Sequence, residues 1–154
     1  MIQTRAGYAG GLKDQPTYKT IGDHAEALRV VYDPERTSYV QLLKHLARWH
    51  TPRRTLGQYR SIVFVLEGEQ AAVQRYLDTL GEVHPEIIAE GADSGRFWDA
   101  EDYHQKYRLR RDSAAMEKLR ARYGEAWDRS ELATKLNARG VEGFEAGEWE
   151  EALG

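Results

Sequence analysis

The side chain with the clearest potential for acid–base chemistry is Glu26, which lies within HAEALRVVYDP at residues 24–34. Counting by twos along a predicted strand places Glu26 on the face that carries Leu28 and Val30. A carboxyl group directed toward an apolar interior loses hydration, which favours its neutral form and would let it donate a proton. The same pattern fits a glutamate at a strand end that reaches water, so both interpretations stand.

Two tyrosines could complement this carboxyl group. Tyr8 lies in GYAGG, where glycines let the backbone come close to a ligand, and Tyr59 immediately precedes the apolar run of RSIVFVLEG. Taken singly, each is more simply a packing residue. Together with a protonated Glu26, the two phenols would surround a polarised oxygen atom with hydrogen-bond donors.

Other classes of site are not indicated. None of the 154 residues is a cysteine, which excludes disulfides, thiolate metal sites and cysteine nucleophiles among them. GYAGG is not followed by the Gly-Lys-Ser/Thr of a phosphate-binding loop, and Ser61 does not lie in a nucleophile elbow. The histidines show no metal-binding spacing, so we expect neither a metal nor a bound cofactor; they stand at positions 24, 45, 50, 84 and 104.

Composition argues against nucleic acid and membrane partners. The net charge is −3, and acidic residues interleave with the basic runs KYRLRR and KLRAR, which favours solvated helix faces. The longest apolar runs are far shorter than the roughly 20 residues that cross a bilayer. MIQTRAGYAGG lacks the apolar middle region of a signal peptide, so we expect a cytoplasmic location.

The elements that must position these side chains alternate between strands and helices. Periodicity predicts an amphipathic helix that begins at Ser38, another over 69–80, and a helical region over 113–137 with a capping box from Asp128 to Glu131. Strands are predicted over 2–9, 24–34, 60–68 and 86–91. This order predicts an α/β or α+β fold.

Several stretches, in this order, resemble the A-type peptide methionine sulfoxide reductases: GYAGG (7–11), PTY (16–18), HAEALRVVYDP (24–34), SYVQLL (38–43), QYRS (58–61), EQ (69–70) and AEDYHQKY (100–107). The resemblance covers roughly residues 4–109. It implies an α+β sandwich with a ferredoxin-like core and a mixed sheet. We therefore expect a domain over 1–111, followed by a helical C-terminal extension and acidic tail over 112–154.

The resemblance also implies a reaction. Members of this family repair oxidised methionine by reducing the S epimer of methionine sulfoxide, free or in peptides. A thiolate attacks the sulfur while a glutamic acid and two tyrosines hold and protonate the oxygen, and these positions fall on Glu26, Tyr8 and Tyr59. A second thiol or thioredoxin then regenerates the enzyme.

The sequence departs from the family at the nucleophile. Family members carry Gly-Cys-Phe-Trp upstream of GYAGG, and their Asp-containing GNDVGT stretch has no counterpart in RRTLG. Three interpretations follow. The sequence could begin downstream of the native start, as an N-terminally incomplete gene model. It could be a cysteine-free protein that binds methyl sulfoxides without reducing them. It could instead be an interaction module that acts through the helices of 113–137.

Overall fold

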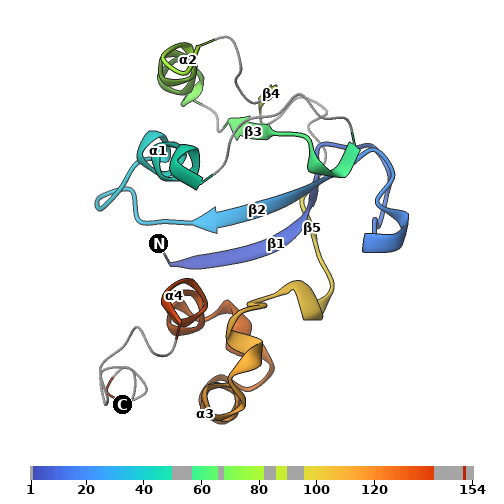
Figure 1. Cartoon of the computed structure of the whole chain (residues 1–154), viewed down its shortest axis with the longest axis vertical. Helices are drawn as coiled ribbons and strands as arrows, with labels where there is room; N and C mark the ends of the chain where they lie inside the picture. The colour runs from blue at the N-terminus through green and yellow to red at the C-terminus, as the bar shows by residue number, and fades with distance from the viewer. Residues whose placement is uncertain are drawn as a thin grey trace. The chain divides into compact units, whose positions relative to one another are not determined.

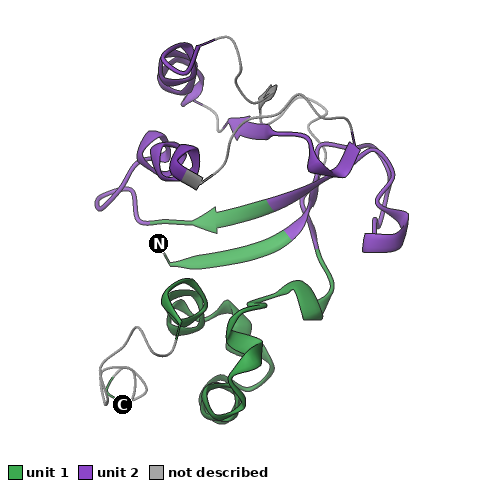
Figure 2. Ribbon diagram, viewed as in Figure 1, with its two compact units in different colours: residues 1–6, 28–32, 100–154 green, residues 7–27, 33–99 purple. Residues whose placement is uncertain are grey.

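The computed structural model describes residues 2–49, 57–65, 68–81, 86–89, 96–140 and 151 (Figure 1). Their contacts divide the chain into two compact units (Figure 2). One unit consists of residues 1–6, 28–32 and 100–154, and the other of residues 7–27 and 33–99. The predicted boundary between 1–111 and 112–154 stays a prediction. No helix in the described part of the chain is both long and apolar enough to cross a membrane.

A three-stranded sheet holds the segment that carries Tyr8. Its strands β1 (Gln3–Ala9), β2 (Ala25–Val31) and β5 (Trp98–Asp99) lie in the order β2-β1-β5. Strand β5 pairs antiparallel to β1, with Tyr8 opposite Trp98. A Cβ atom at Gly7 would lie 2.3 Å from the backbone oxygen of Trp98, so β5 can approach here only because residue 7 is glycine.

A second, parallel pair of strands lies in the unit of residues 7–27 and 33–99. Strands β3 (Ile62–Val65) and β4 (Glu86–Ala89) are joined through helix α2 (Gln70–Asp78), as a parallel connection requires. Helix α1 (Tyr39–Trp49) also contributes to the core, and the Tyr39 hydroxyl donates to the Phe64 carbonyl oxygen at 2.6 Å. The buried core here consists of Leu43, Val63, Val65, Val73 and Leu77.

The helices of the other unit have a core of their own. Short 3-10 helices η3 (Asp102–His104) and η4 (Leu109–Arg111) precede α3 (Ser113–Tyr123), η5 (Gly124–Arg129) and α4 (Glu131–Arg139). Each long helix begins at a side-chain cap, because Ala115 N donates to Asp112 and Ala133 N donates to Ser130. The core residues are Leu109, Ala115, Met116, Leu119, Trp127, Leu132, Ala133 and Leu136.

These elements confirm the α+β class, the strand that carries Tyr8 and the helix that begins after Ser38. The helical region after residue 112 is also as predicted, whereas most of the acidic tail lies outside the described residues. The parallel and antiparallel pairings, expected in one mixed sheet, lie in two sheets among the described strands. The predicted cap at Asp128 is wrong, because Ser130 caps α4 and the Asp128 carboxylate pairs with Arg5.

Candidate functional site

Two side chains at the start of β2 hold the turn that follows Tyr8. The fully buried His24 ring accepts a hydrogen bond at Nδ1 from Gly11 N (3.2 Å) and contacts the Lys13 carbonyl oxygen through Nε2 (2.7 Å). A carbonyl oxygen can only accept and a backbone N–H can only donate, so the proton of the neutral ring is on Nε2. His24 therefore fixes the turn to the strand that carries Glu26, two residues further along.

The Asp23 carboxylate completes this attachment. Its oxygens accept from Leu12 N at 2.8 Å and Lys13 N at 3.3 Å, and these bonds, that of Leu12 foremost, lower the pKa of Asp23. A Cβ atom at Gly11 would lie 2.5 Å from the carboxylate, so the close approach requires glycine at that position. Gly11 of GYAGG thus allows the close contact by which Asp23 and His24 hold the turn in place.

A long-range hydrogen bond joins the two segments that carry the tyrosines. The Arg60 guanidinium donates from Nη2 to the Gly10 carbonyl oxygen at 2.8 Å. Gly10 has φ of +80°, and a Cβ atom there would lie 3.2 Å from both that nitrogen and the Phe64 ring. Since Tyr8 lies two residues before Gly10 and Tyr59 one before Arg60, the structure brings GYAGG and QYRS side by side.

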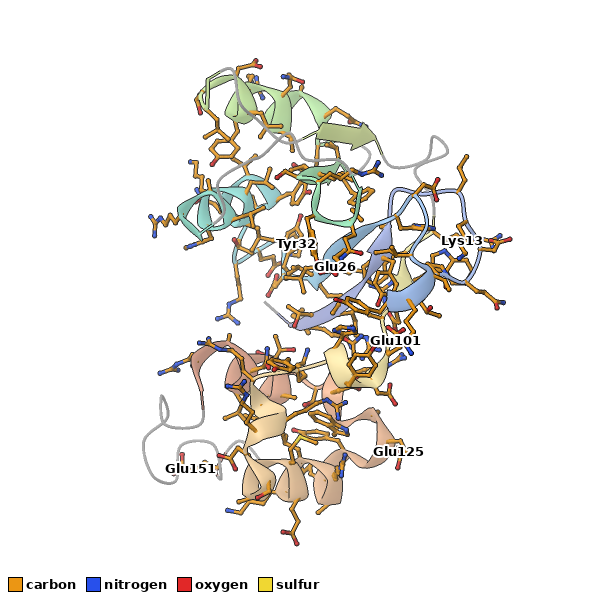
Figure 3. All side chains as sticks on the ribbon, turned by 45° about the vertical axis from the view of Figure 1, so that its right-hand side comes forward. Lys13, Glu26, Tyr32, Glu101, Glu125 and Glu151 are labelled. Carbon is orange, nitrogen blue, oxygen red and sulfur yellow. The ribbon has the colours of Figure 1, made fainter. Side chains whose placement is uncertain are left out.

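The three predicted site residues differ in exposure. Tyr8 is 2% exposed within β1, whereas Tyr59, at the end of the 3-10 helix η2 (Gly57–Tyr59), is 63% exposed. Glu26 is exposed on β2 (Figure 3), as is Leu28. The interpretation that this face of β2 points into an apolar interior is therefore wrong, because Glu26 and Leu28 are exposed and neither described core cluster includes a side chain of β2.

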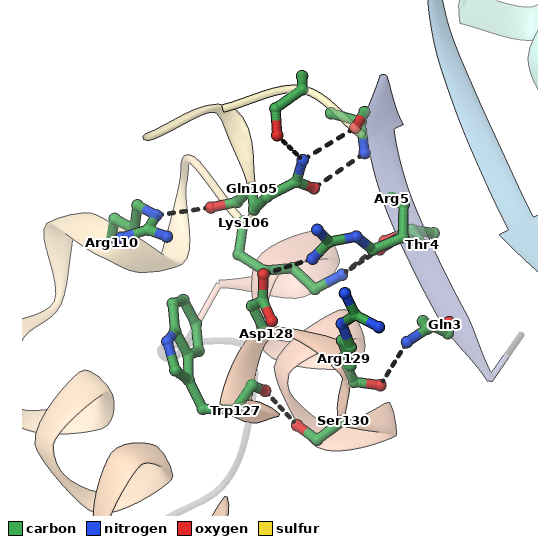
Figure 4. Close-up of polar contacts among 12 residues, drawn as sticks. Gln3, Thr4, Arg5, Gln105, Lys106, Arg110, Trp127, Asp128, Arg129 and Ser130 are labelled. Carbon is green, nitrogen blue, oxygen red and sulfur yellow. Dashed lines mark hydrogen bonds and ion pairs between the residues drawn. The ribbon is translucent and has the colours of Figure 1, made fainter. Parts of the chain in front are cut away.

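Sequence reasoning missed a buried polar group of residues against the first half of β1 (Figure 4). The Gln105 amide accepts from Ala6 N at 3.0 Å and donates to the carbonyl oxygens of Ala6 (2.8 Å) and Ala100 (2.9 Å). Gln105 is 1% exposed. The motif AEDYHQKY was the only sequence signal for this group. Nothing in the motif indicates that its glutamine binds the backbone of Ala6 in β1.

Charged side chains continue this group. Arg5 and Asp128 form a buried ion pair, and Lys106 Nζ donates to the Thr4 carbonyl oxygen at 2.6 Å and the Thr4 hydroxyl at 2.9 Å (Figure 4). Burial lowers the pKa of Lys106 to about 8; Asp128 opposes this shift and Arg5 adds to it. These contacts fix the strand that leads into Tyr8.

A sequence model of the family described as peptide methionine sulfoxide reductase matches residues 1–136. The chain belongs to this family. Peptide methionine sulfoxide reductase MsrA of Nocardia farcinica is 39% identical over 123 residues, which cover 71% of each chain. Peptide methionine sulfoxide reductase A5 of Arabidopsis thaliana is 34% identical over 152 residues, and the rice protein of the same name is 35% identical.

The region that matches the reductase family includes the contacts described above but no thiol. The chain matches 92% of its own length to the two plant relatives but spans only 60% of theirs. The matched region contains the turn held by Asp23 and His24 and the contact between Gly10 and Arg60. It contains no cysteine.

Proposed function

We propose that this chain forms the sulfoxide-binding part of a peptide-methionine (S)-S-oxide reductase that repairs oxidised methionine. The observation that carries the proposal is the hydrogen bond from Arg60 to Gly10, which joins the segments of Tyr8 and Tyr59. His24 ties the same turn to the strand of Glu26. Three segments with the appropriate hydrogen-bond donors are thus held together by described contacts.

The chemistry follows from the sulfoxide group. Its oxygen carries partial negative charge and accepts hydrogen bonds, while its sulfur is electrophilic. Tyr8 and Tyr59 would donate to the oxygen, and Glu26 would deliver the proton that lets it leave.

A thiol that supplies the electrons must come from outside these residues, because none of the 154 residues is a cysteine. In the balanced reaction, two thiols and one sulfoxide give a disulfide, a thioether and water. We propose thioredoxin or another dithiol as the reductant, methionine sulfoxide in peptides or free as the substrate, and the cytoplasm as the location.

The lack of cysteine also favours a second candidate function, binding of methyl sulfoxides without reduction. A hydroxyl or an amine cannot replace the thiolate, which combines high nucleophilicity with an accessible pKa. Both candidates share the same binding site, so binding and turnover must be measured separately.

Titration with the two epimers of N-acetyl methionine sulfoxide, followed by NMR, tests the binding site. We expect the S epimer to shift the signals of Tyr8 and Tyr59 at millimolar concentration, and Glu26→Gln to remain folded and bind the same epimer. Glu35→Gln, at another exposed glutamate, is the matched control. Absence of binding by the wild-type chain would exclude both functions.

Turnover then separates the two candidates. With dithiothreitol present, production of N-acetyl methionine would support reduction by a thiol from outside these residues. In that case Glu26→Gln should lower the rate at least about 100-fold, since general acid catalysis contributes about that much or more. Binding without any product would support the second candidate, and an unchanged rate in Glu26→Gln would remove Glu26 as the acid.

A further inference from the structure

A cavity of about 550 Å³ lies among the helices of residues 100–154. Three arginines line it: Arg108 directly precedes η4, Arg111 ends η4, and Arg139 ends α4. Among the described lining residues, Asp112 is the only acidic one. The predicted sulfoxide-binding residues all belong to the other compact unit, so this cavity is a separate feature of the chain.

Hydrogen bonds fix the backbone from which the arginines extend. The Asn137 side-chain oxygen accepts from Arg108 N at 3.0 Å and Leu109 N at 3.2 Å, which attaches the start of η4 to α4. At the other end of η4, the Asp112 carboxylate accepts from Ala115 N at 2.9 Å and begins α3. The cavity wall is therefore formed by backbone that is held on both sides, as a binding site requires.

The positive charge of this wall is not neutralised within the described residues. The Arg111 guanidinium lies over the Tyr107 ring, 5.2 Å from its centre, and donates to the Tyr107 hydroxyl at 3.4 Å, so an uncharged group holds it. No ion pair of Arg108 or Arg111 joins the described carboxylates. Since three guanidinium groups face one carboxylate, the cavity should attract anions.

We propose that this cavity binds a small molecule that carries a diphosphate group. The inference goes beyond the proposed function and does not depend on it. A guanidinium presents its donors as a rigid fork that matches phosphate oxygens, and two linked phosphates offer enough oxygens for several arginines at once. The volume lies within the range of small-molecule sites, about 300–1,000 Å³, and leaves room for both phosphates.

Isothermal titration of the full chain with inorganic pyrophosphate, at low ionic strength, tests the proposal. We expect Arg108→Gln and Arg111→Gln each to weaken binding about tenfold or more, because each loses hydrogen bonds between charged groups. Arg120→Gln is the matched control, since Arg120 is an exposed arginine of α3 that does not line the cavity. It removes the same charge and should keep the affinity within about twofold of the wild type. Citrate, which carries carboxylates in place of phosphates, should bind more weakly than pyrophosphate.

NMR locates the site in the wild type and so does not depend on the folding of a variant. Pyrophosphate should shift the amide signals of Ser113 and Ala114, which line the cavity in the first turn of α3. Shifts confined to other residues would overturn the proposal, as would absence of binding at about 10 mM pyrophosphate. An equal loss of affinity in Arg120→Gln would show general attraction to a charged surface instead. Binding of citrate as tight as that of pyrophosphate would refute the assignment of a phosphate ligand.

Discussion

The free energy of unfolding should depend on pH because the ammonium group of Lys106 is buried. This side chain is 5% exposed, and burial is the main cause that lowers its pKa from 10.5 to about 8. Because the folded pKa lies below the unfolded one, the unfolded chain binds more protons between pH 8 and pH 10.5. The free energy of unfolding should therefore rise with pH across this window, whereas below pH 8 the cost of the buried ammonium is fully present.

The size of the effect has an upper limit. An interval from pH 8 to pH 10.5, at about 1.4 kcal/mol per pH unit, corresponds to about 3.5 kcal/mol. The attraction of Asp128 is already contained in this pKa, but the two acceptors on Thr4 stabilise the ammonium form further, so part of the penalty is offset. We expect a measured gain of about 1–2 kcal/mol.

Urea unfolding at closely spaced pH values from 7 to 10 measures this gain. The comparison is between the wild type, Lys106→Met, and Lys44→Met as a control at an exposed lysine of α1. Ionisation of tyrosines affects all three proteins and cancels in the differences. The wild type should gain stability relative to Lys106→Met as the pH rises, while Lys44→Met follows the wild type. Parallel curves for the wild type and Lys106→Met would refute the reasoning.

Three further substitutions test the packing that supports the site, each by urea unfolding at pH 7. Asp128→Asn should cost about 3–5 kcal/mol, because two buried cations lose their carboxylate; a loss below about 1 kcal/mol would contradict this. Gly7→Ala should cost more than about 2 kcal/mol, because the new Cβ atom overlaps the backbone oxygen of Trp98; wild-type stability would show that β5 yields easily. Ser130→Ala should cost about 1 kcal/mol through loss of the α4 cap, whereas Ser113→Ala, which removes no cap, should be nearly neutral; equal losses would argue against the capping assignment.

Local patterns predicted the elements well where one segment determines its own structure. The apolar period after Ser38 and its capping side chain specify α1, and Gln41 N donates to Ser38 Oγ at 3.3 Å. Asp128 shows the limit of such patterns. Its spacing to Glu131 fits a capping box, but its carboxylate pairs with Arg5, 123 residues earlier, which no local pattern reports.

The sequence predicted which residues belong to the candidate site. It did not predict how exposed they are or which residues they contact. Glu26 alternates correctly with Leu28 for a buried face, yet burial depends on what covers a strand, and both side chains are exposed. The glycines of GYAGG indicated that another group approaches the backbone closely, but they did not indicate which group it is. That partner is Arg60 for Gly10 and Asp23 for Gly11, and each became apparent only from contacts in space.

The contacts of Gln105 and Lys106 also determine which backbone groups along the edge of β1 stay open to pairing. Strand β5 pairs with β1 over only two residues, Gly7 and Tyr8, and a longer bare edge along β1 would be a template for pairing with another molecule. Past that point the Gln105 amide occupies both backbone groups of Ala6, and Lys106 occupies the carbonyl oxygen of Thr4. Two consecutive side chains thus bind backbone groups of β1 beyond its pairing with β5, and groups bound in this way cannot pair with a strand of another molecule.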